Sequence, residues 1–203
     1  MNKIKLFNIS LAVSLAVCMS VSAYGASVGS RIKDTTLRLH VVANSDDTDD
    51  QQLKLRVRDA ILESFDDILS AKTAARAKEI AGGQKEKMER AAKEEIKKSV
   101  KDYGVEVLMC EEYFETKQYG DFVLPAGRYD AVKVVIGEGK GENWWCVMFP
   151  PLCSGAVEDA EIVAYYESEA GQDVALIISG ARKKVTLKLK SLEFMESLIE
   201  KIK

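Results

Sequence analysis

The sequence predicts an α+β protein, a single domain in which helices pack on a mixed sheet, preceded by a signal peptide. Apolar residues alternate along several short segments, as in strands, and recur every three or four residues along longer ones, as in helices. The chain has 203 residues, of which 47% are hydrophobic, so it is long enough to bury the core of one ordinary domain. An apolar leader comes before this region.

The N-terminus has the features of a secretory signal peptide. Lys3 and Lys5 supply positive charge, residues 6–21 are almost wholly apolar, and Ala23 ends a run of small residues that signal peptidase accepts. We therefore expect export and cleavage after Ala23, with an uncleaved membrane anchor or a lipoprotein at Cys18 as the alternatives. The predicted divisions are a signal peptide at residues 1–23, a polar linker at 24–34 and a domain at 35–203.

The domain begins with a predicted strand, turn and helix. Residues 37–43 alternate in polarity and then become wholly apolar, which indicates a strand with at least one buried face. The polar residues that follow favour a turn. Thr48 and Gln51 fit a capping box, in which the two side chains bond backbone groups at the start of a helix. Apolar residues at helical spacing then predict a helix over residues 51–69.

A second helical region and three more strands are predicted to follow. Residues 71–100 are rich in Ala, Lys and Glu, and Gly82-Gly83 should divide them into two helices. The loop with glycines at 137, 139 and 141 is predicted to connect two strands as a hairpin. The three further strands are predicted at residues 105–114, 128–136 and 144–149.

The C-terminal part has a less regular pattern. Residues 157–166 and 174–178 fit either helix or strand. Residues 185–190 alternate like a strand, and residues 191–203 resemble a helix that would close an edge or a face of the sheet.

Composition and spacing exclude several kinds of function. The only histidine, His40, rules out metal sites with several histidines, and a formal net charge of −3 argues against nucleic-acid binding. The glycine loop lacks the spacing of a dinucleotide or phosphate loop. The acidic residues 44–50 lack the central glycine and closing glutamate of a calcium loop. Since no hydrolase motif occurs either, we predict no catalytic residue, metal or cofactor.

One short segment contains both tryptophans and two cysteines. Trp144 and Trp145 are neighbours on a predicted strand, so they point to opposite faces, and one of them can anchor a partner while the other is buried. Cys146 and Cys153 could form a disulfide outside the cytosol. The alternative is that both of these cysteines and Cys110 are buried thiols.

Residues 72–101 carry ten basic and five acidic side chains, a local excess of positive charge in an acidic protein. A solvated helix face with ion pairs between successive turns explains this excess. A peripheral contact with anionic lipid head groups is the alternative hypothesis.

Two long parts of the chain have a distinctive sequence. The first part is LRLHVVANSD at 37–46, continued by DQQLKLRVRDA at 50–60. The second part is LPAGRY at 124–129, VVIGEG at 134–139, NWWC at 143–146 and FPPLC at 149–153. Both parts resemble the stage II sporulation protein R family, and the resemblance covers roughly residues 35–153.

This resemblance implies a signalling protein of endospore-forming bacteria rather than an enzyme. Proteins of this family are made in the forespore and exported into the space between the forespore and mother-cell membranes. There they trigger a membrane-embedded aspartic protease, stage II sporulation protein GA, to process the sigma-E precursor. We expect the surface that contacts the protease to comprise Asn44, Ser45, Asp46, Arg56, Asp59, Trp144 and Trp145.

An exported cell-envelope enzyme or a wall-binding module is the competing hypothesis. It requires His40, Asp46 and a cysteine to converge within hydrogen-bond reach in a pocket. The spacing of these residues in the sequence does not show whether they do.

Overall fold

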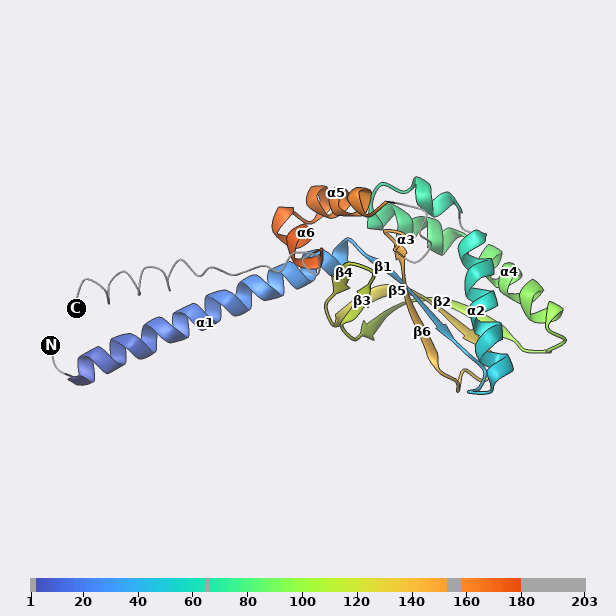
Figure 1. Cartoon of the computed structure of the whole chain (residues 1–203), viewed down its shortest axis with the longest axis horizontal. Helices are drawn as coiled ribbons and strands as arrows, with labels where there is room; N and C mark the ends of the chain where they lie inside the picture. The colour runs from blue at the N-terminus through green and yellow to red at the C-terminus, as the bar shows by residue number, and fades with distance from the viewer. Residues whose placement is uncertain (1–2, 65, 153–157, 180–203) are drawn as a thin grey trace.

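Helices lie on both faces of a mixed four-stranded sheet, as Figure 1 shows for the residues that the computed structural model describes, 3–64, 66–152 and 158–179. This arrangement confirms the predicted α+β class. The helices are α1 (Lys3–Asp34), α2 (Thr48–Glu63), α3 (Ala74–Gly83), α4 (Lys85–Lys98), α5 (Asp159–Glu169) and α6 (Gln172–Ile178), with a 3-10 turn at Asp66–Ser70. The sheet consists of β1 (Leu37–Val42), β2 (Val105–Phe114), β5 (Gly127–Ile136) and β6 (Asn143–Phe149), and a separate hairpin of β3 (Lys117–Tyr119) and β4 (Phe122–Leu124).

Strand β1 lies inside the sheet, whose strand order is β2-β5-β1-β6. It runs parallel to β5 and antiparallel to β6, and all six of its residues are buried. The four strands begin and end within one residue of the predicted positions. The predicted hairpin between β5 and β6 is wrong, because β1 lies between these two strands. The loop 137–142 therefore crosses the end of β1.

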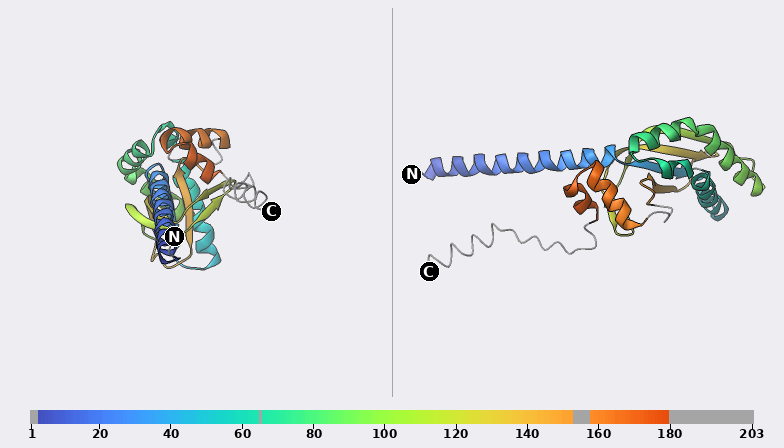
Figure 2. Two further views of the ribbon diagram at one scale, coloured as in Figure 1. Left: turned by 90° about the vertical axis from the view of Figure 1, so that its left-hand side faces the viewer. Right: turned by 90° about the horizontal axis from the view of Figure 1, so that it is seen from above.

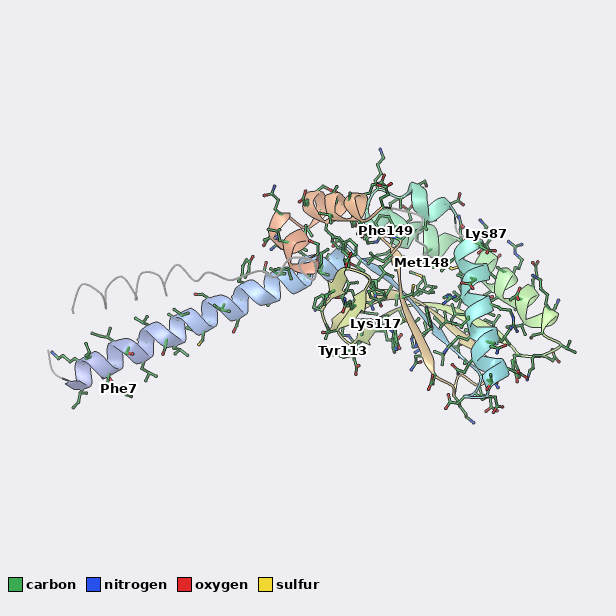
Figure 3. The ribbon with its side chains drawn as sticks, viewed as in Figure 1. Phe7, Lys87, Tyr113, Lys117, Met148 and Phe149 are labelled. Atoms are coloured by element: carbon green, nitrogen blue, oxygen red, sulfur yellow. The ribbon has the colours of Figure 1, made fainter. Side chains whose placement is uncertain are left out.

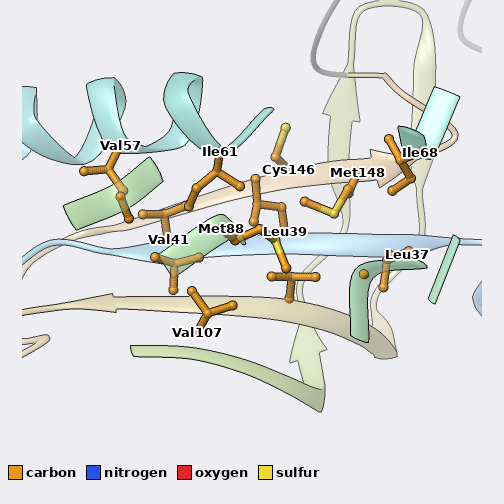
Figure 4. Packing of buried hydrophobic residues seen from close by; sticks show 14 of the residues in the cluster. Leu37, Leu39, Val41, Val57, Ile61, Ile68, Met88, Val107, Cys146 and Met148 are labelled. Carbon is orange, nitrogen blue, oxygen red and sulfur yellow. The ribbon is translucent and has the colours of Figure 1, made fainter. Parts of the chain in front are cut away.

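One face of the sheet packs against α2, α3 and α4. Leu37, Leu39 and Val41 of β1 point to this face, which Figure 4 shows in close view. Val57 of α2 and Met88 of α4 are fully buried in the same cluster. Each helix presents one apolar stripe to the sheet, and burying a large apolar side chain contributes about 1.5–3 kcal/mol to stability. This cluster is the main core of the domain.

The opposite face carries polar residues of β1 beside a second apolar cluster. Arg38 and His40 point to this side and are both buried. The β3–β4 hairpin, α5, α6 and the last turns of α1 cover this face, and they bury Ile32, Phe122 and Tyr166. Because both faces of β1 are covered, the polar residues of its alternating pattern, Arg38 and His40, are buried and need partners within the fold.

Helix α1 has two parts with different surroundings. The large apolar side chains of its N-terminal part are exposed, and Figure 3 shows Phe7 far from the sheet. By length and composition α1 can cross a membrane, which is compatible with the predicted signal peptide and with an anchor. The predicted polar linker at 24–34 is wrong, because these residues continue the helix and bury Val28 and Ile32 against the domain.

Polar contacts hold the end of α1 against the C-terminal helices. Arg31 Nη2 donates to Asp173 Oδ2 at 2.6 Å, and Arg31 Nη1 donates to the carbonyl oxygen of Ala170 at 2.6 Å. The Tyr24 hydroxyl donates to the same carboxylate at 2.8 Å. These bonds from Arg31 and Tyr24 hold the pKa of Asp173 well below its usual range. The helix thus continues from its protruding part directly into the domain, as the right-hand view in Figure 2 shows.

The helix predicted at 51–69 is confirmed only as far as Glu63, where α2 ends, and a separate 3-10 turn follows at Asp66–Ser70. The region predicted at 71–100 forms α3 and α4, which meet at Gln84 beside the predicted break. The predicted capping box is wrong, because Asp47 is the N-cap of α2 and makes no side-chain cap bond. The side chain of Gln51 instead donates to the carbonyl oxygen of Ser45 at 2.9 Å.

The two segments of undecided type, 157–166 and 174–178, contribute to α5 and α6 and are therefore helical where they are described. The predicted strand at 185–190 and helix at 191–203 lie outside the described residues.

Ion pairs within the chain engage much of the basic region. Arg76 Nη1 lies 2.6 Å from Glu79 and Lys98 Nζ lies 2.9 Å from Glu95, each pair being one helical turn apart. Such pairs are what a solvated helix face makes. The contact of this region with a membrane stays a prediction.

Replacing Leu39 with Ala should lower the free energy of unfolding by about 3 kcal/mol, because the side chain is fully buried and its removal leaves a cavity. Leu176→Ala is the matched control, since Leu176 is 63% exposed, and we expect a change within about 0.5 kcal/mol. Urea unfolding of the full chain in non-ionic detergent micelles measures both. Equal losses in the two variants would contradict the assignment of the core.

Candidate functional site

Hydrogen bonds join the turn after β1 to the loop that crosses the end of this strand. The backbone N–H of Glu138 donates to Asn44 Oδ1 at 2.9 Å, and the N–H of Glu142 donates to Asp46 Oδ1 at 2.7 Å. Buried Lys54 of α2 donates to the carbonyl oxygen of Glu142 at 2.9 Å. We call this arrangement the crossover clamp, made of residues 43–47, residues 137–142 and the first turns of α2.

Asp50 is the buried carboxylate of the clamp. It is 2% exposed, accepts hydrogen bonds from Asn44 Nδ2 at 2.8 Å and Ser45 Oγ at 2.7 Å, and lies 3.7 Å from Lys101 Nζ. Burial raises the pKa of Asp50, but the hydrogen bonds from Asn44, Ser45 and Tyr103 and the charge of Lys101 outweigh it, so the pKa is lowered. The ionised carboxylate is therefore the form that holds the turn.

Glycines let the two segments of the clamp approach each other. Gly137 has a φ of +57°, and a Cβ added there would collide with the side chain of Asn44. A Cβ added at Gly141 would collide with the backbone carbonyl of Ser45. Close packing over the end of β1 thus accounts for the spacing of these glycines.

Three of the residues predicted to bind a partner, Asn44, Ser45 and Asp46, lie in this clamp. Their side chains bond groups within the chain and give the turn its shape. Their contact with a partner protein stays a prediction.

Two other predicted residues, Arg56 and Asp59, lie on the outer face of α2. The Asp59 side chain is 54% exposed, and Arg56 Nε lies 3.4 Å from Glu95 of α4. The guanidinium of Arg58 lies 4.5 Å from the ring centroid of Trp144, whose exposed fraction is 36%. Exposed Trp and Arg side chains are common anchors of protein interfaces. We call Arg56, Arg58, Asp59 and Trp144 the α2–β6 patch, in which Arg56 lies on the α4 side of α2 and Arg58 on the β6 side.

Trp145 lies on the opposite face of the sheet from Trp144, as the alternation of a strand predicts. Its ring stacks on His40 at 3.9 Å and meets Phe114 edge to face at 4.8 Å. His40 Nδ1 lies 2.6 Å from Glu112, and its Nε2 lies 2.7 Å from Asn143. The seven predicted residues are therefore divided between the clamp, the α2–β6 patch and this second face.

Glu112 joins the imidazole of His40 to a lysine. Lys133 Nζ donates to Glu112 Oε1 at 2.7 Å. Burial raises the pKa of Glu112, but the hydrogen bonds from Lys133 and His40 and their charges outweigh it, so the pKa is lowered. This network gives both ring nitrogens of buried His40 a partner on the second face of β1.

The competing hypothesis of an envelope enzyme required His40, Asp46 and a cysteine in one pocket. Asp46 bonds the clamp and His40 bonds two other side chains, so these residues do not come together. Burial raises the pKa of the Cys110 thiol, which disfavours its thiolate. In the described part of the chain, no three His, Cys, Asp or Glu side chains gather in a way that would hold a metal ion.

Cys146 is disulfide-bonded, which is one of the two predicted alternatives, whereas Cys18 and Cys110 are free. Cys153, the predicted partner of Cys146, lies outside the described residues.

Comparison with known proteins decides the family. A family model described as stage II sporulation protein R matches residues 33–159, more than half of the chain. The chain belongs to the stage II sporulation protein R family. Stage II sporulation protein R of Bacillus subtilis (strain 168) is 37% identical over 142 residues, which cover 68% of this chain and 62% of that relative. The match thus spans less than two thirds of the relative's length, and no solved structure matches the chain.

The residues that carry the resemblance to the stage II sporulation protein R family lie mainly in β1, the clamp, α2, β5 and β6. Reasoning from the sequence missed the roles of Arg38, Glu112 and Lys133. The available signal was charge. Arg38 lies within the predicted strand 37–43 and Lys133 lies opposite that strand. A charge in a strand that is covered on both faces requires buried partners.

Asn44→Ala should lower the free energy of unfolding by about 1–3 kcal/mol, because it leaves the Glu138 N–H without its acceptor and removes one of the hydrogen bonds to the buried Asp50 carboxylate. Asp47→Ala is the control, since the side chain of this N-cap makes no cap bond, and a change below about 0.5 kcal/mol is expected. Chemical unfolding of the full chain in micelles gives both values. A neutral Asn44→Ala would show that the clamp does not stabilise the fold.

The stabilisation by Asp50 should depend on pH. Its pKa in the folded state lies below the ordinary value of 3.8, so the stabilisation is complete above that value and is lost as the pH falls through the lowered pKa. The difference in unfolding free energy between the wild type and Asp50→Asn should therefore shrink from about pH 5 to about pH 2. A difference that stays constant over this interval would contradict the ionised clamp.

Proposed function

We propose that this chain is an exported signalling protein of sporulation, which activates a membrane-embedded aspartic protease to process the sigma-E precursor. The proposed partner is stage II sporulation protein GA, and the proposed location is the space between the forespore and mother-cell membranes. Membership of the stage II sporulation protein R family is the observation that carries the proposal. The apolar N-terminal helix supports it, because such a signal has to reach or cross a membrane.

Activation through binding requires a surface and not a nucleophile. A ligand shifts an equilibrium only by its difference in affinity for the two states, and a change from 1:99 to 99:1 takes about 5.5 kcal/mol. A few buried Trp or Arg anchors, each giving about 2 kcal/mol or more, are sufficient for this. The α2–β6 patch offers such anchors on a rigid helix and an adjoining strand.

The clamp and the α2–β6 patch have different parts in this proposal. The clamp fixes the first turn of α2 to the end of β1 and thereby sets the position of Arg56 and Asp59. Trp144 begins β6 next to the same loop. Asn44, Ser45 and Asp46 thus act by positioning the patch, and Trp145 acts by supporting β6 from the other face.

The structure of α1 gives the proposal a second form, in which the leader is retained. Since the end of α1 is bound to α6 through Arg31 and Asp173, an uncleaved α1 would hold the domain in a fixed orientation at the membrane surface. With cleavage after Ala23, the remaining turns of α1 would stay with the secreted domain.

Trp144→Ala, Arg56→Ala and Asp59→Ala should each reduce processing of the sigma-E precursor, because each removes a side chain of the proposed contact. The assay expresses the full chain in the forespore of an endospore former that lacks its own stage II sporulation protein R. Arg76→Ala is the matched control, because Arg76 is exposed on α3 and its side chain pairs with its neighbour Glu79. Immunoblots compare the two forms of the sigma factor.

Thermal melting of each variant separates lost contact from lost folding. Full processing by all three folded variants would reject the α2–β6 patch. Failure of the unaltered chain to restore processing in a host that does accept another member of the family would reject the proposed function itself.

A further inference from the structure

We propose that a cavity on the second face of the sheet binds the carboxylate of a small ligand or peptide end, with Arg38 as its counter-charge. The cavity has a volume of about 390 Å³. Tyr113 and Lys117, labelled in Figure 3, are among the residues that line it. Arg38, Phe114 and Trp145 line it as well.

Arg38 is a buried cation without a buried anion beside it. Its side chain is 0% exposed, Nε donates to the carbonyl oxygen of Cys146 at 3.1 Å, and Nη2 donates to the Tyr119 hydroxyl at 2.6 Å. Nη1 is buried and has no hydrogen-bond partner among the described residues, and no carboxylate there forms an ion pair with this guanidinium. Leaving such a donor unpaired costs about 1–3 kcal/mol, and more for a charged group.

Aromatic rings stabilise this cation only in part. The Arg38 guanidinium lies 4.3 Å from the ring centroid of Phe114, 5.0 Å from that of Tyr129 and 5.4 Å from that of Tyr119. Each such contact contributes about 0.5–2 kcal/mol. Burial lowers the pKa of Arg38, which shows the direction of the desolvation penalty. A ligand oxygen on Nη1 would remove the unpaired donor and supply the missing charge.

The walls of the cavity indicate which anion fits. Phe114 and Trp145 offer apolar ring surface, so a carboxylate attached to an apolar group suits the site better than a bare ion. Lys117 adds a second positive charge at the exposed rim, whereas Glu115 adds a negative one. This balance favours a single negative charge over the two charges of a phosphate.

Access to Arg38 depends on an exposed segment. Residues 115 and 116 join β2 to β3, line the cavity and are exposed, and the bond from the Ala126 N–H to Thr116 Oγ1 is a contact that their movement would break. Trp145 borders the cavity and stacks on His40. Its fluorescence therefore reports directly on an occupied cavity.

The test titrates the full chain, as Trp144→Phe in non-ionic micelles, and follows the fluorescence of Trp145. The probes are acetyl-Gly-Gly-Phe with a free C-terminal carboxylate, the same peptide as its C-terminal amide, benzoate, and inorganic phosphate. We expect saturable changes with the peptide acid or with benzoate, and binding at least about tenfold weaker for the amide and for phosphate. Tighter binding of the peptide acid identifies a peptide end as the ligand class, and tighter binding of benzoate identifies a small acid.

Variants then test whether the change in Trp145 fluorescence comes from binding in the cavity. Lys117→Met should weaken binding about threefold to tenfold, whereas Lys93→Met on the far side of the domain should leave it unchanged. Arg38→Gln should abolish binding if its circular dichroism matches the wild type, and Lys117→Met carries the test if it does not fold.

Three results would overturn the proposal: no saturable change up to about 10 mM of either acid, equal binding of acid and amide, or equal effects of Lys117→Met and Lys93→Met. The assay contains no protease and the cavity lies away from the α2–β6 patch, so its failure would leave the proposed signalling function standing. Failure of the processing assay would likewise leave this site standing.

Discussion

Strand β1 has a partner strand on each side and a covered face above and below, and the rest of the domain is arranged around this burial. Its two neighbours, β5 and β6, follow each other in the chain, so the segment that joins them has to cross the end of β1. The crossing brings the loop 137–142 against the turn after β1. Close approach requires glycines there, and the polar turn supplies the hydrogen bonds that the crossing backbone needs.

The burial of β1 also determines which partners its polar side chains need. Arg38 and His40 lie on a covered face, so each needs partners within the fold, and these come from strands and loops that are distant in the sequence. His40 obtains two side-chain partners and a stacked ring, whereas Arg38 keeps one unpaired nitrogen. The two residues thus differ in their free hydrogen-bonding capacity. Both ring nitrogens of His40 have partners, whereas Arg38 keeps an unpaired N–H and lines a cavity.

Local patterns predicted the strands and most helix limits, because alternation and helical spacing report burial along one segment. Local patterns do not predict the order of the strands, because the pairing of β1 with both β5 and β6 depends on contacts across the whole chain. For the same reason Asn44, Ser45 and Asp46 were expected at a contact surface, whereas the crossing loop engages their side chains. Helical spacing separates Arg56 and Asp59 from buried Leu53 and Val57, and their contact with a partner stays a prediction. Residues 24–34 were predicted as a linker because their apolar stripe is short. It consists of Val28 and Ile32, one helical turn apart, and two positions do not establish helical periodicity.

The central claim is that the domain acts outside the cell that makes it, through its surface. Leu11 and Leu15 lie in the exposed apolar part of α1, away from the domain, so Leu11→Arg with Leu15→Arg should block entry into the membrane and leave the fold intact. Leu11→Ala with Leu15→Ala is the matched control. With the Arg variant made in the forespore, the account predicts that sigma-E precursor processing is lost, while the Ala variant supports it. Normal processing by an Arg variant retained in the forespore cytosol would contradict the account.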